Sequence, residues 1–112
     1  MTETKSESKY QFVEIASQED VPEGERLAFD IGSIPVVLFH TTAGFFAIED
    51  LCTHENSPLN DGELSGMSIK CLEHGACFDI RTGAALNLPA VKPTRTFPVR
   101  LTDGKIQVGI PV

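Results

Sequence analysis

Short apolar and β-branched runs recur along the chain, and turn residues separate them at intervals of about ten residues. Residues 10–15, Tyr-Gln-Phe-Val-Glu-Ile, alternate in polarity as a half-buried strand does. Residues 26–31 and 34–40 flank Gly32-Ser33 and predict a hairpin. Further strands are expected at residues 45–48, 67–71, 78–80, 84–86, 97–101 and 105–110. The pattern therefore predicts an all-β fold.

Two local signals refine this picture. Asp103-Gly104 lies between the last two expected strands and favours a tight type I′ turn. Only residues 18–25 could form a helical turn, and Pro22 and Gly24 keep it short.

The length of 112 residues suits one domain, which we place at residues 10–112. Residues 1–9 are polar and mixed in charge, so we expect them to be a disordered leader. They lack the apolar core of a signal peptide, and their acidic residues argue against a transit peptide. No apolar run approaches the roughly 18 residues of a membrane span. We therefore expect a cytoplasmic protein.

Charge and cysteine content narrow the function further. The net charge of −7 argues against binding to nucleic acid or anionic lipid, because both would repel the chain. Three cysteines cannot form a complete disulfide framework. Cysteine and histidine grouped together in a reducing compartment indicate a metal site or catalysis.

Two short motifs in the middle of the chain supply that grouping. Cys52-Thr53-His54 and Cys71-Leu72-Glu73-His74 are separated by 16 residues and give the pattern C-x-H-x16-C-x2-H. This is the ligand arrangement of a Rieske [2Fe–2S] centre, in which two Cys bind one iron and two His bind the other. The predicted ligands are therefore Cys52, His54, Cys71 and His74, carried by loops between strands.

Zinc is the alternative for the same ligand set, since Cys2His2 sites are common structural zinc sites. Zinc fingers usually place their two Cys together and their two His together, and here the two types are interleaved. Two neighbouring residues have simpler interpretations than ligation. Cys77 is expected to be a small packing side chain, although a redox thiol is the alternative, and His40 a satisfied or surface histidine.

Beyond the ligands, the chain resembles a Rieske-type ferredoxin, the small electron carrier of bacterial multicomponent aromatic-ring dioxygenases. The resemblance runs from about residue 10 to residue 108 and includes the segments Leu59-Asn60-Asp61-Gly62, Gly75-Ala76-Cys77-Phe78-Asp79, Arg81-Thr82-Gly83 and Leu88-Pro89-Ala90. It implies three stacked antiparallel sheets, with one [2Fe–2S] cluster held at one end by two loops. It also implies that residues 88–90 cover the cluster as a third loop.

Four positions differ from the cytochrome bc-type members of the superfamily. Ser57 and Glu73 stand where those proteins carry a bridging disulfide, so that bridge is absent here. Ala76 and Phe78 stand where they carry Ser and Tyr hydroxyls directed at the cluster sulfurs. Missing donors and a nearby carboxylate both disfavour the reduced state, which predicts a reduction potential of roughly −150 mV.

The resemblance implies a one-electron carrier that passes electrons from a flavin-dependent NAD(P)H reductase to a terminal Rieske non-haem iron oxygenase through transient contacts. It is not expected to be an enzyme, because oxygenase chemistry needs a further two-His, one-carboxylate iron site and only His40 remains. No nucleotide-binding fingerprint is present either. The alternative is a small Rieske subunit of another redox enzyme, such as an assimilatory nitrite reductase.

Overall fold

The structure is a computed structural model, and it describes residues 10–53, 58–72, 75–87 and 92–111. Within these ranges the chain forms ten strands and one short 3-10 helix. They are β1 (Tyr10–Ser17), η1 (Gln18–Asp20), β2 (Arg26–Ile31), β3 (Ile34–Thr41), β4 (Gly44–Glu49), β5 (Glu63–Ser65), β6 (Ser68–Lys70), β7 (Cys77–Asp79), β8 (Thr96–Phe97), β9 (Val99–Thr102) and β10 (Lys105–Pro111). The predicted all-β class is confirmed.

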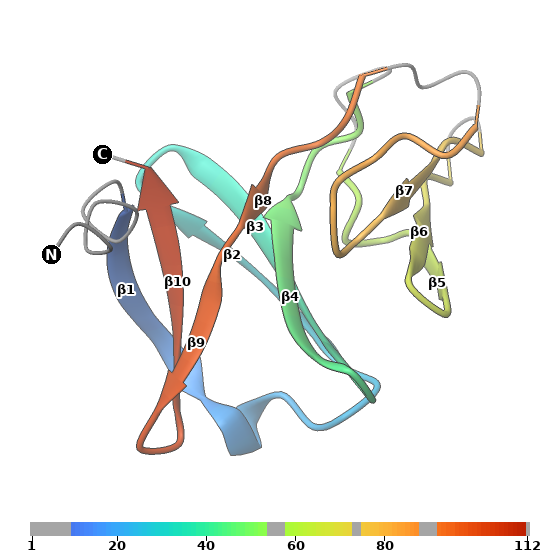
Figure 1. The fold of residues 1–112 in the computed structure, drawn as a ribbon. Coiled ribbons are helices and arrows are strands. Elements are labelled where there is room, and N and C mark those ends of the chain that lie inside the picture. The colour runs from blue at the N-terminus through green and yellow to red at the C-terminus, as the bar shows by residue number, and fades with distance from the viewer. Residues whose placement is uncertain (1–9, 54–57, 73–74, 88–91, 112) are drawn as a thin grey trace, which may run out of the picture.

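The strands form three antiparallel sheets (Figure 1). The terminal sheet has the order β1-β10-β9, the central sheet β2-β3-β4-β8, and the loop sheet β5-β6-β7. The terminal sheet and the loop sheet lie at opposite sides of the molecule, with the central sheet between them (Figure 1). This arrangement agrees with the three sheets that the resemblance implied.

Strand β3 explains why the central sheet lies in the middle. Successive side chains of a strand point to opposite faces, and four consecutive residues of β3 are fully buried. Val36 and Leu38 belong to a core shared with Ile106 and Val108 of the terminal sheet. Val37 and Phe39 belong to a second core shared with Ile69 and Phe78 of the loop sheet. Because both faces of β3 are covered, its residues form a continuous apolar run in the sequence.

Several local predictions hold. Strand β2 has the predicted bounds, and η1 is the expected helical turn in shortened form. Asp103 and Gly104 both have positive φ, 53° and 77°, as a type I′ turn requires.

Other predicted boundaries were wrong. The strand expected at residues 97–101 is divided by Pro98, which has no N–H to donate. Before Pro98 the chain pairs with β4 in the central sheet, and after it β9 pairs with β10 in the terminal sheet. Residues 84–86 form only the single bridge between Phe78 and Ala85, and strand β5 was missed.

The predicted disordered leader, residues 1–9, lies outside the described residues. No helix among residues 10–53, 58–72, 75–87 and 92–111 is both long and apolar enough to cross a membrane.

Candidate metal centre

The first predicted ligand loop, residues 52–62, leaves the central sheet directly after β4. Cys52 follows the end of β4 by three residues and is fully buried. The backbone N–H of Asp50 donates to the carbonyl of Pro35 on β3 at 2.9 Å, so the start of this loop is attached to the central sheet. Cys52 therefore enters the loop from a fixed point on the scaffold.

The Asp50 side chain holds the other end of the same loop. Its Oδ1 accepts hydrogen bonds from the backbone N–H groups of Leu59 at 2.7 Å and Asn60 at 2.6 Å. Its Oδ2 accepts a third from the Asn60 side-chain amide at 2.6 Å. Asp50 is 8% exposed and its bond to Leu59 is buried, whereas its two bonds to the half-buried Asn60 are partly buried. One carboxylate thus joins the two ends of the first loop.

Arg26 of β2 holds the carbonyl groups of the same loop end. Its Nη1 donates to the carbonyl oxygens of Asn60 and Gly62, both at 2.8 Å. The guanidinium lies over the Phe39 ring, with its central carbon 5.2 Å from the ring centroid. The first loop is therefore fixed by side chains that are distant in sequence.

The second predicted ligand loop, residues 71–76, joins β6 to β7 and is held mainly by its own backbone. The N–H of Cys71 donates to the carbonyl of Ala76 at 2.7 Å, and the N–H of Gly75 donates to the carbonyl of Cys71 at 3.0 Å. Gly75 has a φ of 77°, a conformation that favours glycine. Cys71 is 2% exposed.

Asn87 adds the side-chain contact of the second loop. Its Oδ1 accepts from the Cys77 N–H at 2.7 Å, and its Nδ2 donates to the Gly75 carbonyl at 3.2 Å. The Leu86 N–H donates to the Cys77 carbonyl at 2.8 Å. The Cys77 N–H therefore donates to the Asn87 side chain in place of a backbone carbonyl of the neighbouring segment. This loss of a backbone hydrogen bond agrees with the single bridge, instead of a strand, that residues 84–86 form with β7.

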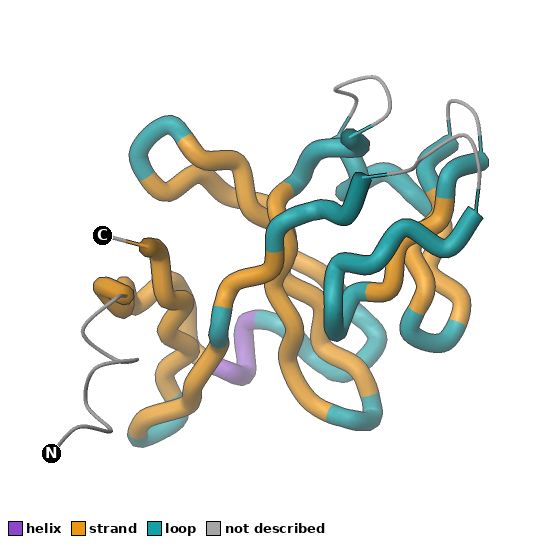
Figure 2. Tube along the Cα trace, turned by 45° about the horizontal axis from the view of Figure 1, so that its top comes forward, coloured by secondary structure: helices purple, strands orange, loops and turns teal. Residues whose placement is uncertain are grey.

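Residues 88–90, predicted to cover the cluster, lie outside the described residues, but both flanks of that segment are described. Asn87 on one side contacts the second loop, as above. On the other side, the Lys92 carbonyl accepts a hydrogen bond from Thr53 Oγ1 in the first loop at 2.8 Å. Each flank therefore contacts one ligand loop. Figure 2 shows the described parts of these loops at the end of the molecule that lies beside the loop sheet.

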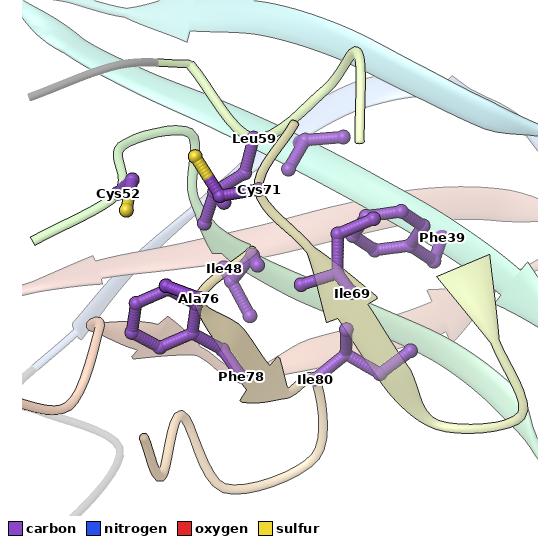
Figure 3. Packing of buried hydrophobic residues seen from close by; sticks show 10 residues of the cluster. Phe39, Ile48, Cys52, Leu59, Ile69, Cys71, Ala76, Phe78 and Ile80 are labelled. Atoms are coloured by element: carbon purple, nitrogen blue, oxygen red, sulfur yellow. The ribbon is translucent and has the colours of Figure 1, made fainter. Parts of the chain in front are cut away.

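Cys52 and Cys71 belong to one buried hydrophobic core, although they come from different loops. In the view of Figure 3 the Cys71 sulfur points to the side on which Cys52 lies. The other two predicted ligands, His54 and His74, lie outside the described residues. Among the described residues alone, no group of three or more His, Cys, Asp or Glu could hold a metal ion. Two buried thiol side chains converging from two loops fit the cysteine half of a Rieske site.

The structure also describes four other residues that the sequence analysis discussed: Ala76, Cys77, Phe78 and His40. Ala76 and Phe78 are fully buried in the core that contains both cysteines. Cys77 is partly buried, and its Sγ lies 3.6 Å from the Gly75 carbonyl as a donor. His40 Nδ1 lies 2.7 Å from the Val21 carbonyl, and its ring stacks on Phe45, which confirms a satisfied histidine. Ser57 and Glu73 lie outside the described residues.

One ion pair at the end of β7 lowers the pKa of a carboxyl group. The Arg81 side chain donates to both carboxylate oxygens of Asp79, from Nη2 at 2.8 Å and from Nε at 3.1 Å. This hydrogen bonding is the main reason that the pKa of Asp79 lies below its ordinary value. The pair is next to the chain reversal after β7 and not at either cysteine.

Comparison with known proteins agrees with this geometry. The family model for the Rieske [2Fe-2S] domain matches residues 11–98. The 3-phenylpropionate/cinnamic acid dioxygenase ferredoxin subunit of Escherichia coli (strain K12) is 40% identical over 93 residues, which cover 82% of this chain and 87% of that protein. The chain therefore belongs to the Rieske [2Fe-2S] domain family, which confirms a Rieske-type cluster as its cofactor.

Solved structures point to the ferredoxin type within that family. The ferredoxin of carbazole 1,9a-dioxygenase from Nocardioides aromaticivorans IC177 superposes with a TM-score of 0.82 at 31% identity, covering 88% of this chain and 96% of that one. A chain from a complex of reduced oxygenase and oxidized ferredoxin of carbazole 1,9a-dioxygenase gives a TM-score of 0.80 at 28% identity, covering 87% and 91%. The predicted class, a ferredoxin that carries electrons, is confirmed.

Three residues that organise the site were not singled out from the sequence. Asp50 follows the strand that leads to Cys52, but a carboxylate after a strand is usually a solvated turn residue. Arg26 lies 34 residues before its partner Asn60, so no local pattern connects them. Asn87 precedes the Pro-containing segment, and only its contacts with Cys77 and Gly75 reveal its role.

Proposed function

We propose that this protein is a low-potential, one-electron carrier that takes electrons from a flavin-dependent NAD(P)H reductase and passes them to a terminal Rieske non-haem iron oxygenase. The observation that carries the proposal is the convergence of Cys52 and Cys71 in one buried core from two separately anchored loops. The similarity to dioxygenase ferredoxins supports an oxygenase as the acceptor, in preference to a nitrite reductase. The cytoplasm is the expected location.

The proposed ligands are Cys52 and Cys71 on one iron and His54 and His74 on the other. When bound, the cluster would supply the redox centre that accepts and releases one electron. The chain's own residues supply burial and position: both cysteines are at most 2% exposed, and fixed loops reduce rearrangement between the two oxidation states. Buried Ala76 and Phe78 offer no side-chain hydroxyl to the cluster sulfurs, which supports a potential of roughly −150 mV.

Electron paramagnetic resonance of the dithionite-reduced protein tests the ligand assignment. We expect a rhombic signal with an average g value below that of the free electron, which is characteristic of mixed Cys and His ligation. The variant His74→Cys should lower the potential if the cluster assembles, because an anionic ligand replaces a neutral one. A colourless protein that contains zinc would contradict the proposal.

The docking surface is proposed to surround the second loop. Leu72 follows Cys71 directly and is 64% exposed, and Leu86 is 52% exposed. Leu86 lies against the start of β7, because its N–H donates to the Cys77 carbonyl. Exposed leucines next to a redox site suit a short-lived contact that buries little area.

The rate of electron transfer to a purified ring-hydroxylating oxygenase tests both the acceptor and the surface. We expect oxidation of the reduced protein by the oxygenase and none by an assimilatory nitrite reductase. Leu72→Ser should slow the transfer about tenfold while leaving the potential unchanged. Leu101→Ser is the matched control, because Leu101 is 48% exposed but lies on β9 in the terminal sheet. Equal slowing by both variants would exclude the proposed surface.

A further inference from the structure

The Asp50 carboxylate is a buried acidic group close to a predicted cluster ligand. It lies two residues before Cys52, so the two Cα atoms are within about 7 Å of each other. All three of its hydrogen bonds come from N–H donors, so both carboxylate oxygens act as acceptors. None of the three donors carries a formal charge. The carboxylate is therefore held in a poorly hydrated region beside the first loop.

Arg26 is the basic group associated with the same loop end. Its Nη1 binds the carbonyls of Asn60 and Gly62, and Asn60 is also a partner of Asp50. Asp50 and Arg26 thus hold the same backbone segment, and the contacts of the described residues include no direct ion pair between them.

A fixed charge near a redox site changes the free energy of adding an electron. The oxidised Rieske site, with two ferric ions, two sulfides, two thiolates and two neutral imidazoles, has zero net charge. The reduced site carries one negative charge. A nearby carboxylate therefore disfavours reduction and a nearby guanidinium favours it, and burial weakens the screening that would diminish both effects.

We infer that Asp50 and Arg26 are positioning residues that also set the reduction potential in opposite directions: Asp50 lowers it and Arg26 raises it. The inference rests on the proposed ligation by Cys52, and it goes beyond that ligation by assigning the potential to residues that do not bind the cluster. It also adds a charged contribution to the lack of hydroxyl donors at Ala76 and Phe78.

The substitution Asp50→Asn removes the charge and can keep the bonds. The amide oxygen of the new side chain still accepts from the Leu59 and Asn60 N–H groups, and rotation of the Asn60 amide restores the third bond. We expect the potential to rise by about 59 mV, which corresponds to a tenfold change in the reduction equilibrium for one electron. Asp61→Asn is the matched control, because Asp61 lies in the first loop, next to the Asn60 that Asp50 binds, but is exposed. It should move the potential much less.

Protein-film voltammetry measures the potential, and electron paramagnetic resonance of the same samples reports the ligation. Arg26→Gln removes the positive charge and should lower the potential, whether or not Asp50→Asn assembles a cluster. An unchanged potential in Arg26→Gln, or equal shifts in Asp50→Asn and Asp61→Asn, would overturn the inference. A wild-type protein without the Rieske signal would instead overturn the proposed ligation, so the two failures are distinguishable.

Discussion

The two ligand loops reach the same core by different physical means. The second loop connects adjacent strands β6 and β7, and its bonds from Cys71 to Ala76 and from Gly75 to Cys71 are local and formed by backbone. The first loop is held by the charged side chains of Asp50 and Arg26, and its contact with Arg26 spans 34 residues of sequence. The second loop can form once its hairpin forms, whereas the first needs the central sheet to be in place.

The side chains that hold the two loops also differ in charge and burial. The side chain that holds the second loop, Asn87, is neutral and exposed. The side chain that holds the first loop, Asp50, is charged and buried. Substitutions of the side chains that hold the first loop should therefore affect both folding and the reduction potential, while substitution of Asn87 should affect mostly the local order of the second loop.

The largest effect is expected where the end of the first loop packs against β6. A Cβ on Gly62 would overlap the carbonyl oxygen of Lys70 and lie 3.1 Å from that of Leu59, both of which are backbone atoms. Gly62→Ala must therefore displace the first loop from β6, at a cost of about 4 kcal/mol in the free energy of unfolding. Urea unfolding of the loaded protein measures this cost.

Gly66→Ala is the control for that variant. Gly66 has a φ of 61°, but a Cβ added there would have no neighbouring atom within 4 Å, so its substitution costs only backbone strain of about 1 kcal/mol. A similar loss for both variants would mean that the contact between Gly62 and Lys70 is not tight.

The sequence predicted the scaffold better than the contacts that organise the loops. The continuous apolar run of β3 is a direct signal, because it follows from the packing of both faces of that strand. The burial of β1 is less regular than its alternation in polarity predicts, because its pairing with β10 is irregular between Glu14 and Ala16. Strand β5, Glu63-Leu64-Ser65, is short and polar, so it carries no such signal and forms through pairing with β6. The strand predicted at residues 97–101 ran through Pro98. A residue that cannot donate a backbone hydrogen bond could have predicted this division, because the chain changes sheets there.

The next effect in size compares the two side chains that hold the loops. Asp50→Ala removes the acceptor of three hydrogen bonds and leaves the buried Leu59 N–H without a partner, which should cost about 3 kcal/mol. Asn87→Ala removes two bonds at an exposed position, where water can replace them, and should cost about 1 kcal/mol. Unfolding free energies and iron content per chain, measured on both variants, test this order. An equal or larger loss from Asn87→Ala would contradict the asymmetry between the loops.

The smallest effect concerns pH and lies in the loop sheet beyond the second loop. Hydrogen bonding from Arg81 lowers the pKa of Asp79 below its ordinary value of 3.8. A lowered pKa in the folded state means that the pair stabilises the fold above pH 3.8 and that this contribution is lost as the pH falls through the folded value. Arg81→Gln should therefore return the pKa of Asp79 toward 3.8, and it should destabilise the protein slightly above pH 3.8 but not at a pH below the folded pKa.

Carbon NMR of the Asp79 carboxyl group, titrated downward from neutral pH, measures that pKa, and the visible absorption of the cluster reports that the protein stays loaded. Arg100→Gln is the matched control, since the Arg100 side chain donates to the neutral Gln107 side chain and its loss should leave the pKa of Asp79 unchanged. Because Arg81 is exposed, its effect should also diminish with added salt. A shift that persists in high salt would mean that the Asp79 carboxylate is less hydrated than its position in the loop sheet implies.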